Sequence, residues 1–358
     1  MQWQVAASFP AGAGQATALG FAGPVCGVHG PVMLVAGGAN FPDGMPWLGG
    51  KKKYYDDVYV FKKKGDSIVL TKGEFKLPSA IAYAASCSVP NGILYAGGEN
   101  DNGISNKVWL LQWNEATSAV TTVSLADLPI ALTNAAVTVH GNMVYLAGGE
   151  TAVAASDAFY CLDLSNTAAG WMQLPSVPIQ VSHTVLGVLT AGGHGSIYLA
   201  GGRKKNENGI SDLYSLVYAF NIEKNQWIQK KSLPYRLCAG TGVAVNDSRL
   251  IMFGGDKGET FHRVETLIAA IGAEQDPAQK AILLRQKNDL QSKHPGFSKE
   301  VLIYDAGKDQ WKAIGSIPYD APVTTTAFKW GNDVIIPSGE IRAGVRTPNI
   351  LKVKLPGK

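Results

Sequence analysis

A short apolar strand that ends in two glycines recurs along this chain. Five occurrences match closely and a sixth has serine in place of the first glycine; they are Leu34–Gly38, Leu94–Gly98, Tyr145–Gly149, Tyr198–Gly202, Ile251–Gly255 and Val334–Gly339. Counted from Gly37, the first glycine of the next pairs follows after 60, 51, 53 and 53 residues, and Ser338 follows after a further 84. Repeats of about 50 residues predict a propeller or a solenoid and argue against separate globular domains.

Each repeat contains four stretches with strand-like sequence. A run of small residues such as Ala82–Ser88 precedes a turn and the glycine strand, an aromatic third stretch such as Val58–Phe61 follows, and a fourth stretch carries a tryptophan such as Trp171. Asn, Asp and Gly at the turns tolerate positive φ, which suits tight hairpins. Four antiparallel strands per repeat are typical of a propeller blade, and the glycines allow sharp corners where a Cβ would crowd the next blade.

The sixth repeat lacks its tryptophan strand. Its other strands are expected at Thr324–Trp330, Val334–Gly339 and Asn349–Leu355, whereas the stretch with a tryptophan and an aromatic-proline pair is Trp3–Pro10. We therefore expect the N-terminal strand to complete the C-terminal blade, so that no edge of the ring is left unpaired. The prediction is an all-β fold with one six-bladed propeller over residues 1–358.

The long last step indicates a helical hairpin inserted in the fifth blade, at about residues 260–295. Apolar residues with the spacing of one helix face occur at Val264, Leu267, Ile268 and Ile271. Asp276 before Pro277 predicts the start of a second helix, which runs to about Ser292. Loops that leave the glycine strands all emerge on one face of a propeller, so the hairpin is either a decoration or a lid beside the mouth of the ring.

Composition limits the classes of partner. Charged residues make up only 17%, the net charge is +4, and the runs Lys51–Lys53 and Lys62–Lys64 have no interleaved aromatic residues. We expect these lysines to be solvated loop residues, and we expect no nucleic-acid partner.

The cysteines and the N-terminal segment give further expectations. Four cysteines lie far apart in apolar stretches without a C-x-x-C motif, which predicts buried free thiols; they are Cys26, Cys87, Cys161 and Cys238. The uncharged segment Val5–Val28 contains Pro10 and Pro24 and lacks a basic leader. We therefore expect neither a membrane span nor a signal peptide there.

The residue after each glycine pair is the main candidate for chemistry. These positions are Ala39, Glu99, Glu150, Arg203, Asp256 and Glu340. Propeller symmetry places them in a ring around one end of the channel, although such groups also often satisfy backbone amides at corners. The six histidines have no metal-like spacing, so we predict no metal site. His183 is either an acid that lines the channel or a strand histidine with structural partners.

Two features of the chain resemble known families. The glycine pairs and the aromatic strands resemble kelch repeats, and Ser338–Thr347 resembles the Gly-Glu-x-x-x-Gly-x-Arg-Thr stretch of the bacterial N-acetylneuraminate epimerases, which are sialic acid mutarotases. Gly37–Pro42 resembles another corner of that family, and the helical insertion precedes the Glu-Arg corner as it does there. The chain departs from the family at Ser338, where asparagine is usual, and in a blade order that the resemblance implies is cyclically permuted.

The resemblance implies that Glu340 is the catalytic base and that Arg346 assists it. Candidates for binding the substrate are Arg203, Asn40, Glu150 and Glu99. Mutarotation needs a base for the anomeric hydroxyl and an acid for the ring oxygen, and it requires no metal or redox cofactor. A sugar acid also needs a planar donor for its carboxylate, which an arginine supplies with two parallel hydrogen bonds.

These observations predict a mutarotase for N-acetylneuraminate or another small sugar acid, without cofactor, nucleic-acid or membrane partner. The resemblance favours a periplasmic or secreted location. The alternative is a non-catalytic kelch propeller that binds glycan or protein through its loops; a galactose-oxidase-like copper enzyme is disfavoured because the histidines do not cluster. Catalysis requires Glu340 in an accessible pocket beside a cation, whereas a scaffold would leave it hydrogen-bonded at a corner.

Overall fold

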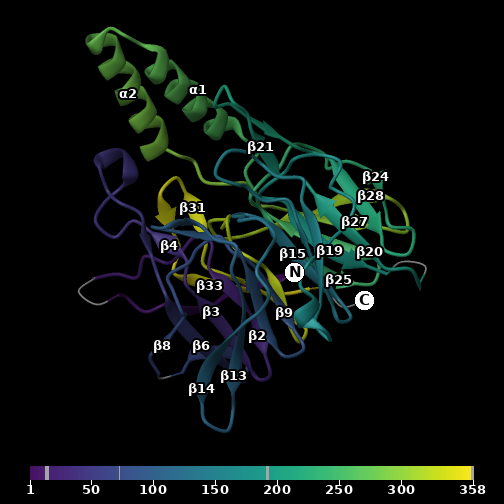
Figure 1. Ribbon diagram of the computed structural model, residues 1–358. Coiled ribbons are helices and arrows are strands. Elements are labelled where there is room, and N and C mark those ends of the chain that lie inside the picture. Colours follow the sequence, from purple (N-terminus) through teal and green to yellow (C-terminus); the bar gives the residue numbers. More distant parts are fainter. Residues whose placement is uncertain (13–15, 72, 191–192, 356–358) are drawn as a thin grey trace.

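The computed structural model describes residues 1–12, 16–71, 73–190 and 193–355, which form six antiparallel blades around a central channel (Figure 1). From the axis outward, the first three blades are β2 (Val25–His29), β3 (Val32–Ala36), β6 (Asp57–Lys64), β7 (Ser67–Leu70); β9 (Ala85–Val89), β10 (Gly92–Ala96), β13 (Val108–Asn114), β14 (Ala119–Ser124); and β15 (Ala136–His140), β16 (Met143–Ala147), β17 (Phe159–Asp163), β18 (Met172–Gln173). A short strand, β8 (Phe75–Lys76), also pairs with β6.

The other three blades follow the same order. They are β19 (Val185–Leu189), β20 (Ser196–Ala200), β23 (Val217–Asn221), β24 (Gln226–Lys230); β25 (Thr241–Asn246), β26 (Arg249–Phe253), β27 (Glu300–Asp305), β28 (Gln310–Ser316); and β29 (Phe328–Trp330), β30 (Asp333–Pro337), β33 (Asn349–Lys354), β1 (Gln2–Ser8). The predicted six-bladed propeller is therefore confirmed.

The N-terminal strand closes the ring as predicted. β1 runs antiparallel to β33, with Trp3 opposite Val353, and the Trp3 ring packs edge-on against Phe253 of the fifth blade at 5.8 Å. The described residues bury their apolar side chains in six clusters, and each cluster lies between two adjacent blades. The core is therefore a ring of interfaces, and each blade is stabilised by both of its neighbours.

The glycine pairs make the corners that bring the blades together. Gly148 has a φ of 66°, and a Cβ there would lie 2.2 Å from the carbonyl oxygen of Val181 in the next blade. Ser338 adopts the same left-handed conformation, with a φ of 57°. Its hydroxyl accepts a hydrogen bond from the Phe21 amide at 2.7 Å and lies 2.6 Å from the Thr347 carbonyl oxygen, so side-chain hydrogen bonds compensate for the strain.

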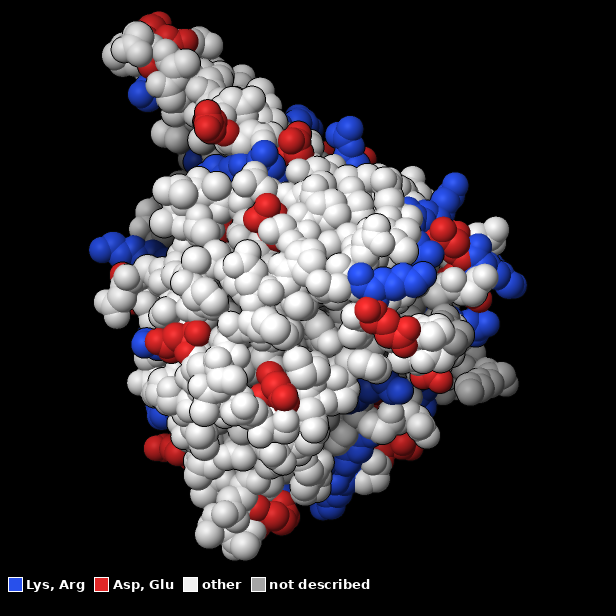
Figure 2. Space-filling model, turned by 45° about the vertical axis from the view of Figure 1, so that its right-hand side comes forward, with Lys and Arg blue, Asp and Glu red and all other residues white. Residues whose placement is uncertain are grey.

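The insertion in the fifth blade forms two helices, α1 (Glu259–Ala273) and α2 (Pro277–Ser292). Asp276 caps α2 by accepting a hydrogen bond from the Ala278 amide at 3.0 Å, as the Asp-Pro pair predicted. The helices project from one end of the propeller (Figures 1 and 2), and neither contributes to an interblade cluster. In the described ranges, no helix is both long and apolar enough to cross a membrane.

The predicted burial agrees with the structure for most of the cysteines but not for the whole of the first lysine run. All four cysteines are unpaired thiols; Cys26, Cys161 and Cys238 are buried, and Cys87 is half-buried. The lysine run at residues 51–53 is not uniformly solvated, because Lys52 turns inward and its side chain is 34% exposed. Charges of both signs are spread over the face seen in Figure 2, in keeping with the small net charge.

Candidate active site

The six corner residues occupy equivalent positions in the six blades. Each forms an antiparallel bridge with a residue that shortly precedes the innermost strand of its own blade; the pairs are Ala22 with Ala39, Ala82 with Glu99, Thr133 with Glu150, Ser182 with Arg203, Cys238 with Asp256 and Val323 with Glu340. In four blades the corner residue opens a short hairpin above the ring: β4 (Ala39–Asn40) with β5 (Lys53–Tyr54), β11 (Glu99–Asn100) with β12 (Gly103–Ile104), β21 (Arg203–Lys205) with β22 (Ser211–Leu213), and β31 (Glu340–Arg342) with β32 (Val345–Arg346). These backbone pairings therefore fix the Cα position of each corner residue.

A second ring lies immediately below the corners. In each blade, the residue that follows the bridge partner of the corner residue has a left-handed backbone, with φ between 51° and 61°. These six residues are Gly23, Tyr83, Asn134, His183, Ala239 and Thr324. The amide of each donates to the carbonyl of the equivalent residue in the preceding blade, over 2.7–3.1 Å, and Gly23 closes the circle by donating to Thr324. We call this closed circle of six hydrogen bonds the floor ring.

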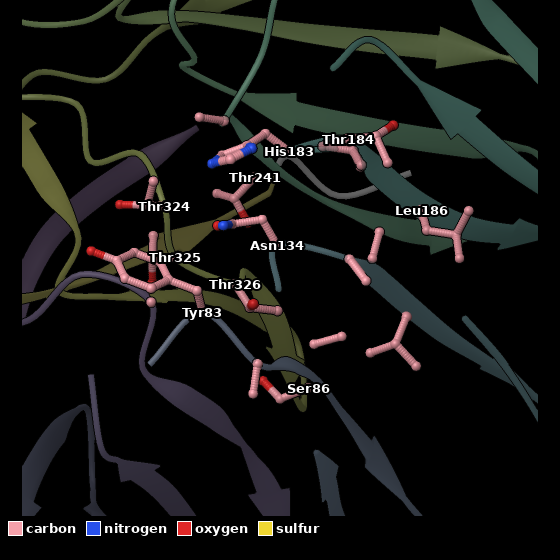
Figure 3. A pocket seen from close by; sticks show the side chains of 18 of the residues that line it. Tyr83, Ser86, Asn134, His183, Thr184, Leu186, Thr241, Thr324, Thr325 and Thr326 are labelled. Carbon is pink, nitrogen blue, oxygen red and sulfur yellow. The ribbon is translucent and has the colours of Figure 1, made fainter. Parts of the chain in front are cut away.

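The floor ring separates two spaces. Above it lies a cavity of about 630 Å³, and below it a channel of about 120 Å³ continues between the inner strands. Figure 3 shows side chains of the ring (Tyr83, Asn134, His183 and Thr324) reaching this channel from separate blades. Five residues of the floor ring, all except Gly23, line both spaces.

The walls of the cavity come from elements far apart in the sequence. Five of the six corner residues line it, namely Glu99, Glu150, Arg203, Asp256 and Glu340. The helical hairpin contributes Phe261, Val264 and Ile268, so the apolar face of α1 is turned to the cavity and not to the core. The segment around the short helix η1 (Pro46–Leu48) closes another side, and the Asn288 side chain of α2 donates to its Trp47 carbonyl at 3.4 Å.

Glu340 and Arg346 form an ion pair at the edge of this cavity. Arg346 Nη2 lies 3.1 Å from Glu340 Oε2, and the Gly344 amide donates to Oε1 at 3.1 Å. The guanidinium lies over the Phe41 ring at 4.7 Å, and the Arg346 side chain is only 4% exposed. Within the described residues, Arg346 Nε and Nη1 have no hydrogen-bond partner although both are buried. A buried N–H group left unpaired costs about 1–3 kcal/mol, so this guanidinium retains hydrogen-bonding capacity that the described protein atoms do not use.

Glu99 belongs to a second charged group on the side of blades one and two. It accepts hydrogen bonds from Lys52 Nζ at 3.2 Å and from the Tyr54 hydroxyl at 2.8 Å. Burial opposes the charge of Lys52, but Tyr83 and Glu99 outweigh it and raise the pKa of Lys52. Burial and the hydrogen bond to Glu99 raise the pKa of Tyr54 to about 12. Lys52 therefore remains a cation within the cavity.

Glu150 and Arg203 form a third group on the side of blades three and four. Glu150 Oε1 accepts from the Ser182 hydroxyl at 2.6 Å and lies 3.5 Å from Arg203 Nη2, while the Arg203 guanidinium packs on Phe261 of α1 at 5.0 Å. His183 Nδ1 is 3.6 Å from Glu150. Burial and the charge of Arg203 lower the pKa of His183 well below its usual value, so the imidazole is neutral and its contact with Glu150 is not an ion pair.

Asp256 and His294 complete the wall beneath the helical hairpin. Asp256 Oδ1 accepts from the Gly258 amide at 2.8 Å, and burial raises the pKa of this carboxyl group. His294 Nδ1 accepts from the Gly296 amide at 3.0 Å, and burial lowers the pKa of the ring. In the described chain, no group of three or more His, Cys, Asp or Glu side chains is arranged to hold a metal ion.

The structure brings most of the sequence candidates together and leaves one out. Glu340, Arg346, Arg203, Glu150 and Glu99 all line the cavity. Asn40 does not; its side chain is buried, donates to the Gly20 carbonyl at 2.8 Å and accepts from the Tyr55 hydroxyl at 2.8 Å. The next residue, Phe41, takes the place at the cavity because successive side chains of an extended segment point to opposite sides.

Sequence reasoning missed several polar residues of the cavity, among them Lys52, Tyr83 and His294. Tyr83 has a signal in the repeats: aligning the bridge residues places it in register with Asn134 and His183. Lys52 and His294 lie in loops that have no counterpart in the other repeats, so the repeat pattern could not reveal them.

The fold and the cavity define a six-bladed β-propeller with a charged pocket at one mouth of its ring. Residues 125–358 match the family described as "NANM: N-acetylneuraminate epimerase", and the chain belongs to this family. Proteins named N-acetylneuraminate epimerase from Haemophilus influenzae (strain PittEE) and Brucella melitensis biotype 1 are each 26% identical, over 232 and 233 residues. These matches cover 65% and 64% of this chain but only 60% and 58% of the relatives.

The solved structure titled "Structure of YjhT" resembles the whole chain. The TM-score is 0.66 with 13% sequence identity, and the match covers 99% of this chain and 98% of the other. At this identity the likeness concerns the fold, which it supports from end to end.

Proposed function

We propose that this protein interconverts the α and β anomers of N-acetylneuraminate or a closely related sugar acid. The observation that carries the proposal is the Glu340–Arg346 pair, in which a carboxylate faces the cavity beside a buried guanidinium with unpaired N–H groups. Membership of the family and the names of the relatives support the same activity. The cavity volume, about 630 Å³, suits a nine-carbon sugar acid, because small-molecule sites commonly measure about 300–1,000 Å³.

The proposed roles follow from the chemistry of a hemiketal acid. Arg346 binds the sugar carboxylate through its free N–H groups. Glu340 takes the proton of the anomeric hydroxyl, the bond between the anomeric carbon and the ring oxygen breaks, and the open keto form recloses on its other face. The carboxylates Glu99 and Glu150 are placed to accept hydrogen bonds from sugar hydroxyls.

The first prediction tests the base. Glu340→Gln keeps the size and hydrogen-bonding reach of the side chain but removes the proton acceptor, so we expect the rate of anomer exchange to fall about 10²-fold or more. Arg346→Lys should chiefly weaken binding, because an ammonium group cannot make the two-pronged carboxylate contact. Proton NMR of freshly released α-anomer measures both effects.

The control variant is Glu223→Gln, which changes an exposed glutamate in an outer turn of the fourth blade. It should convert the α-anomer as fast as wild type. Exchange that is equally fast with and without wild-type protein, across several sialic and related keto-sugar acids, contradicts the proposal and favours a binding propeller in which Glu340 serves as a corner acceptor for Gly344.

A further inference from the structure

Anomer exchange needs a proton donor as well as a base, and the roles above name none. The described cavity wall includes the phenol of Tyr83 and the imidazoles of His183 and His294 as candidate donors, whereas the Lys52 ammonium already donates to Glu99. The following inference rests on the proposed function, because it names the partner of Glu340 in that reaction.

The backbone of Tyr83 is held on both sides. Its amide donates to the Gly23 carbonyl at 2.8 Å, and its carbonyl accepts from the Asn134 amide at 3.0 Å. The φ of 58° is unfavourable for a tyrosine, and such strain persists only where neighbouring structure imposes it. The Tyr83 side chain borders both the cavity above the floor ring and the channel below it. Figure 3 shows it from the channel. Tyr83 is therefore a preorganised group and not a mobile one.

Charged groups from two other blades surround the phenol. Lys52 Nζ of the first blade lies 5.1 Å from the centre of the Tyr83 ring, and Arg346 and Glu340 of the sixth blade line the same cavity as Tyr83. Burial raises the pKa of Tyr83, so the group is neutral and holds its proton at pH 7. Lys52 and Arg346 favour the phenolate, so they stabilise the charge that develops as the proton leaves.

The two histidines are less suited to this role. His183 is grouped with Glu150 and Arg203, not with the Glu340–Arg346 pair. His294 is nearer to Glu340, which together with Asp256 favours its charged form, but burial and Arg342 outweigh them and lower the pKa of the ring. A neutral imidazole is a weak acid, so at pH 7 neither histidine supplies a proton as readily as a cation-flanked phenol does.

We propose that Tyr83 is the general acid that protonates the ring oxygen of the sugar while Glu340 removes the proton of the anomeric hydroxyl. The bond between the anomeric carbon and the ring oxygen breaks, its electron pair stays on that oxygen, and the anomeric oxygen forms the carbonyl. On reclosure the ring hydroxyl attacks the other face of the carbonyl and returns its proton to the Tyr83 phenolate, while Glu340 returns the other proton. Protons and electrons balance without any further reactant.

The decisive variant is Tyr83→Phe, which removes one oxygen and keeps the ring beneath Lys52. We expect kcat to fall about 10²–10⁴-fold while KM changes little, because the hydroxyl acts on the reacting oxygen and not on the carboxylate anchor. The matched control is Tyr95→Phe, which removes the hydroxyl of a buried tyrosine of the same blade that lies in the apolar core. It should leave kcat and KM unchanged.

Site-specific replacement of Tyr83 by 3-fluorotyrosine keeps the hydroxyl but lowers its pKa, so kcat should change even though folding is preserved. A hydroxyl that only supports the fold would leave kcat unchanged, and that result would overturn the proposal. Wild-type kcat in the Tyr83→Phe variant would overturn it as well.

The pH profile separates Tyr83 from His294. With Tyr83 as the acid, kcat stays level from about pH 6 to about pH 9, because the phenol keeps its proton there. With protonated His294 as the acid, kcat would fall as pH rises through the acidic range, because burial lowers the pKa of this ring, and His294→Gln would lose most of the activity. A wild-type protein with no exchange activity defeats the proposed function itself, whereas an active wild type with an equally active Tyr83→Phe variant defeats only this inference.

Discussion

At the scale of single residues, the floor ring imposes a conformation that most side chains disfavour. Glycine and asparagine adopt left-handed φ readily, which suits Gly23 and Asn134, but Tyr83, His183 and Thr324 carry a steric cost of about 1–2 kcal/mol each. The closed circle of hydrogen bonds compensates, since each of the six amides donates to a neighbour in the preceding blade. The ring therefore holds three large or polar side chains in fixed positions at the mouth of the channel.

The buried imidazole of His183 should make stability depend on pH. It stays neutral in the folded state, whereas in the unfolded state it binds a proton below about pH 6.5. The unfolded state then holds more protons, so the free energy of unfolding decreases as pH falls below that value, by at most about 1.4 kcal/mol per pH unit. We expect His183→Asn, which copies the residue of the neighbouring blade, to flatten this decrease.

Urea unfolding at a series of pH values from about 7.5 down to about 5 measures the effect. The matched control is His194→Asn, which removes an exposed imidazole from the same blade. An unchanged slope for His183→Asn would show that the buried histidine does not govern acid stability.

At the scale of elements, the helical hairpin belongs to the cavity more than to the core. Its one buried side chain, Glu265, accepts from the amide and hydroxyl of Ser211 at 2.8 Å and 2.7 Å, and Phe261 covers Arg203. The hairpin leaves and re-enters the blade at adjacent points, because the Ser298 amide donates to the Gly255 carbonyl at 3.0 Å. A short loop can therefore replace it without displacing β26 or β27.

Replacing residues 259–292 with a short Gly-Ser loop should raise KM for the sugar acid and leave the melting temperature nearly unchanged. The reason is that the cavity loses one wall while all six interblade clusters remain intact. Kinetics by NMR and a thermal melt measure the two effects. The control is Ile282→Ala on the exposed side of α2, which should alter neither quantity. Collapse of the fold would show that the hairpin is a structural element and not a lid.

At the scale of the whole molecule, stability depends on closure of the ring. β1 gives the sixth blade its outer strand, and Phe9 after it packs edge-on against Phe21 and Phe61 of the first blade at 5.5 Å and 5.6 Å. These contacts join residues that are distant in sequence, so the first residues stabilise the last blade.

Deletion of residues 1–8 should unfold or aggregate the protein. It leaves β33 as an unpaired edge and removes Trp3 from its contact with Phe253. Size-exclusion chromatography and thermal melting detect the outcome, and Trp3→Ala should give a smaller loss of melting temperature because the strand remains paired. A monomeric deletion variant with the wild-type melting temperature would show that five complete blades and one short blade suffice.

The sequence alone determined the architecture of this protein. Repeat spacing established six blades, the missing tryptophan strand located the closure, and the Asp276–Pro277 pair located the second helix. It also identified the charged corner residues, including Glu340, because propeller symmetry converts equal positions in a repeat into one ring in space. These features depend on local patterns and on symmetry, which a sequence states directly.

Only the tertiary structure decided which side chains face one another. Lys52 in an apparently solvated run turns into the cavity, Phe41 faces Arg346 in place of Asn40, and Tyr83 lines the same cavity as Glu340 from a different blade. Each outcome depends on the backbone conformation of one residue or on contacts between blades, which join positions far apart in the sequence and leave no local pattern. The ring of corner residues was therefore predictable from the sequence, whereas tertiary packing determined which other side chains face these residues in the cavity.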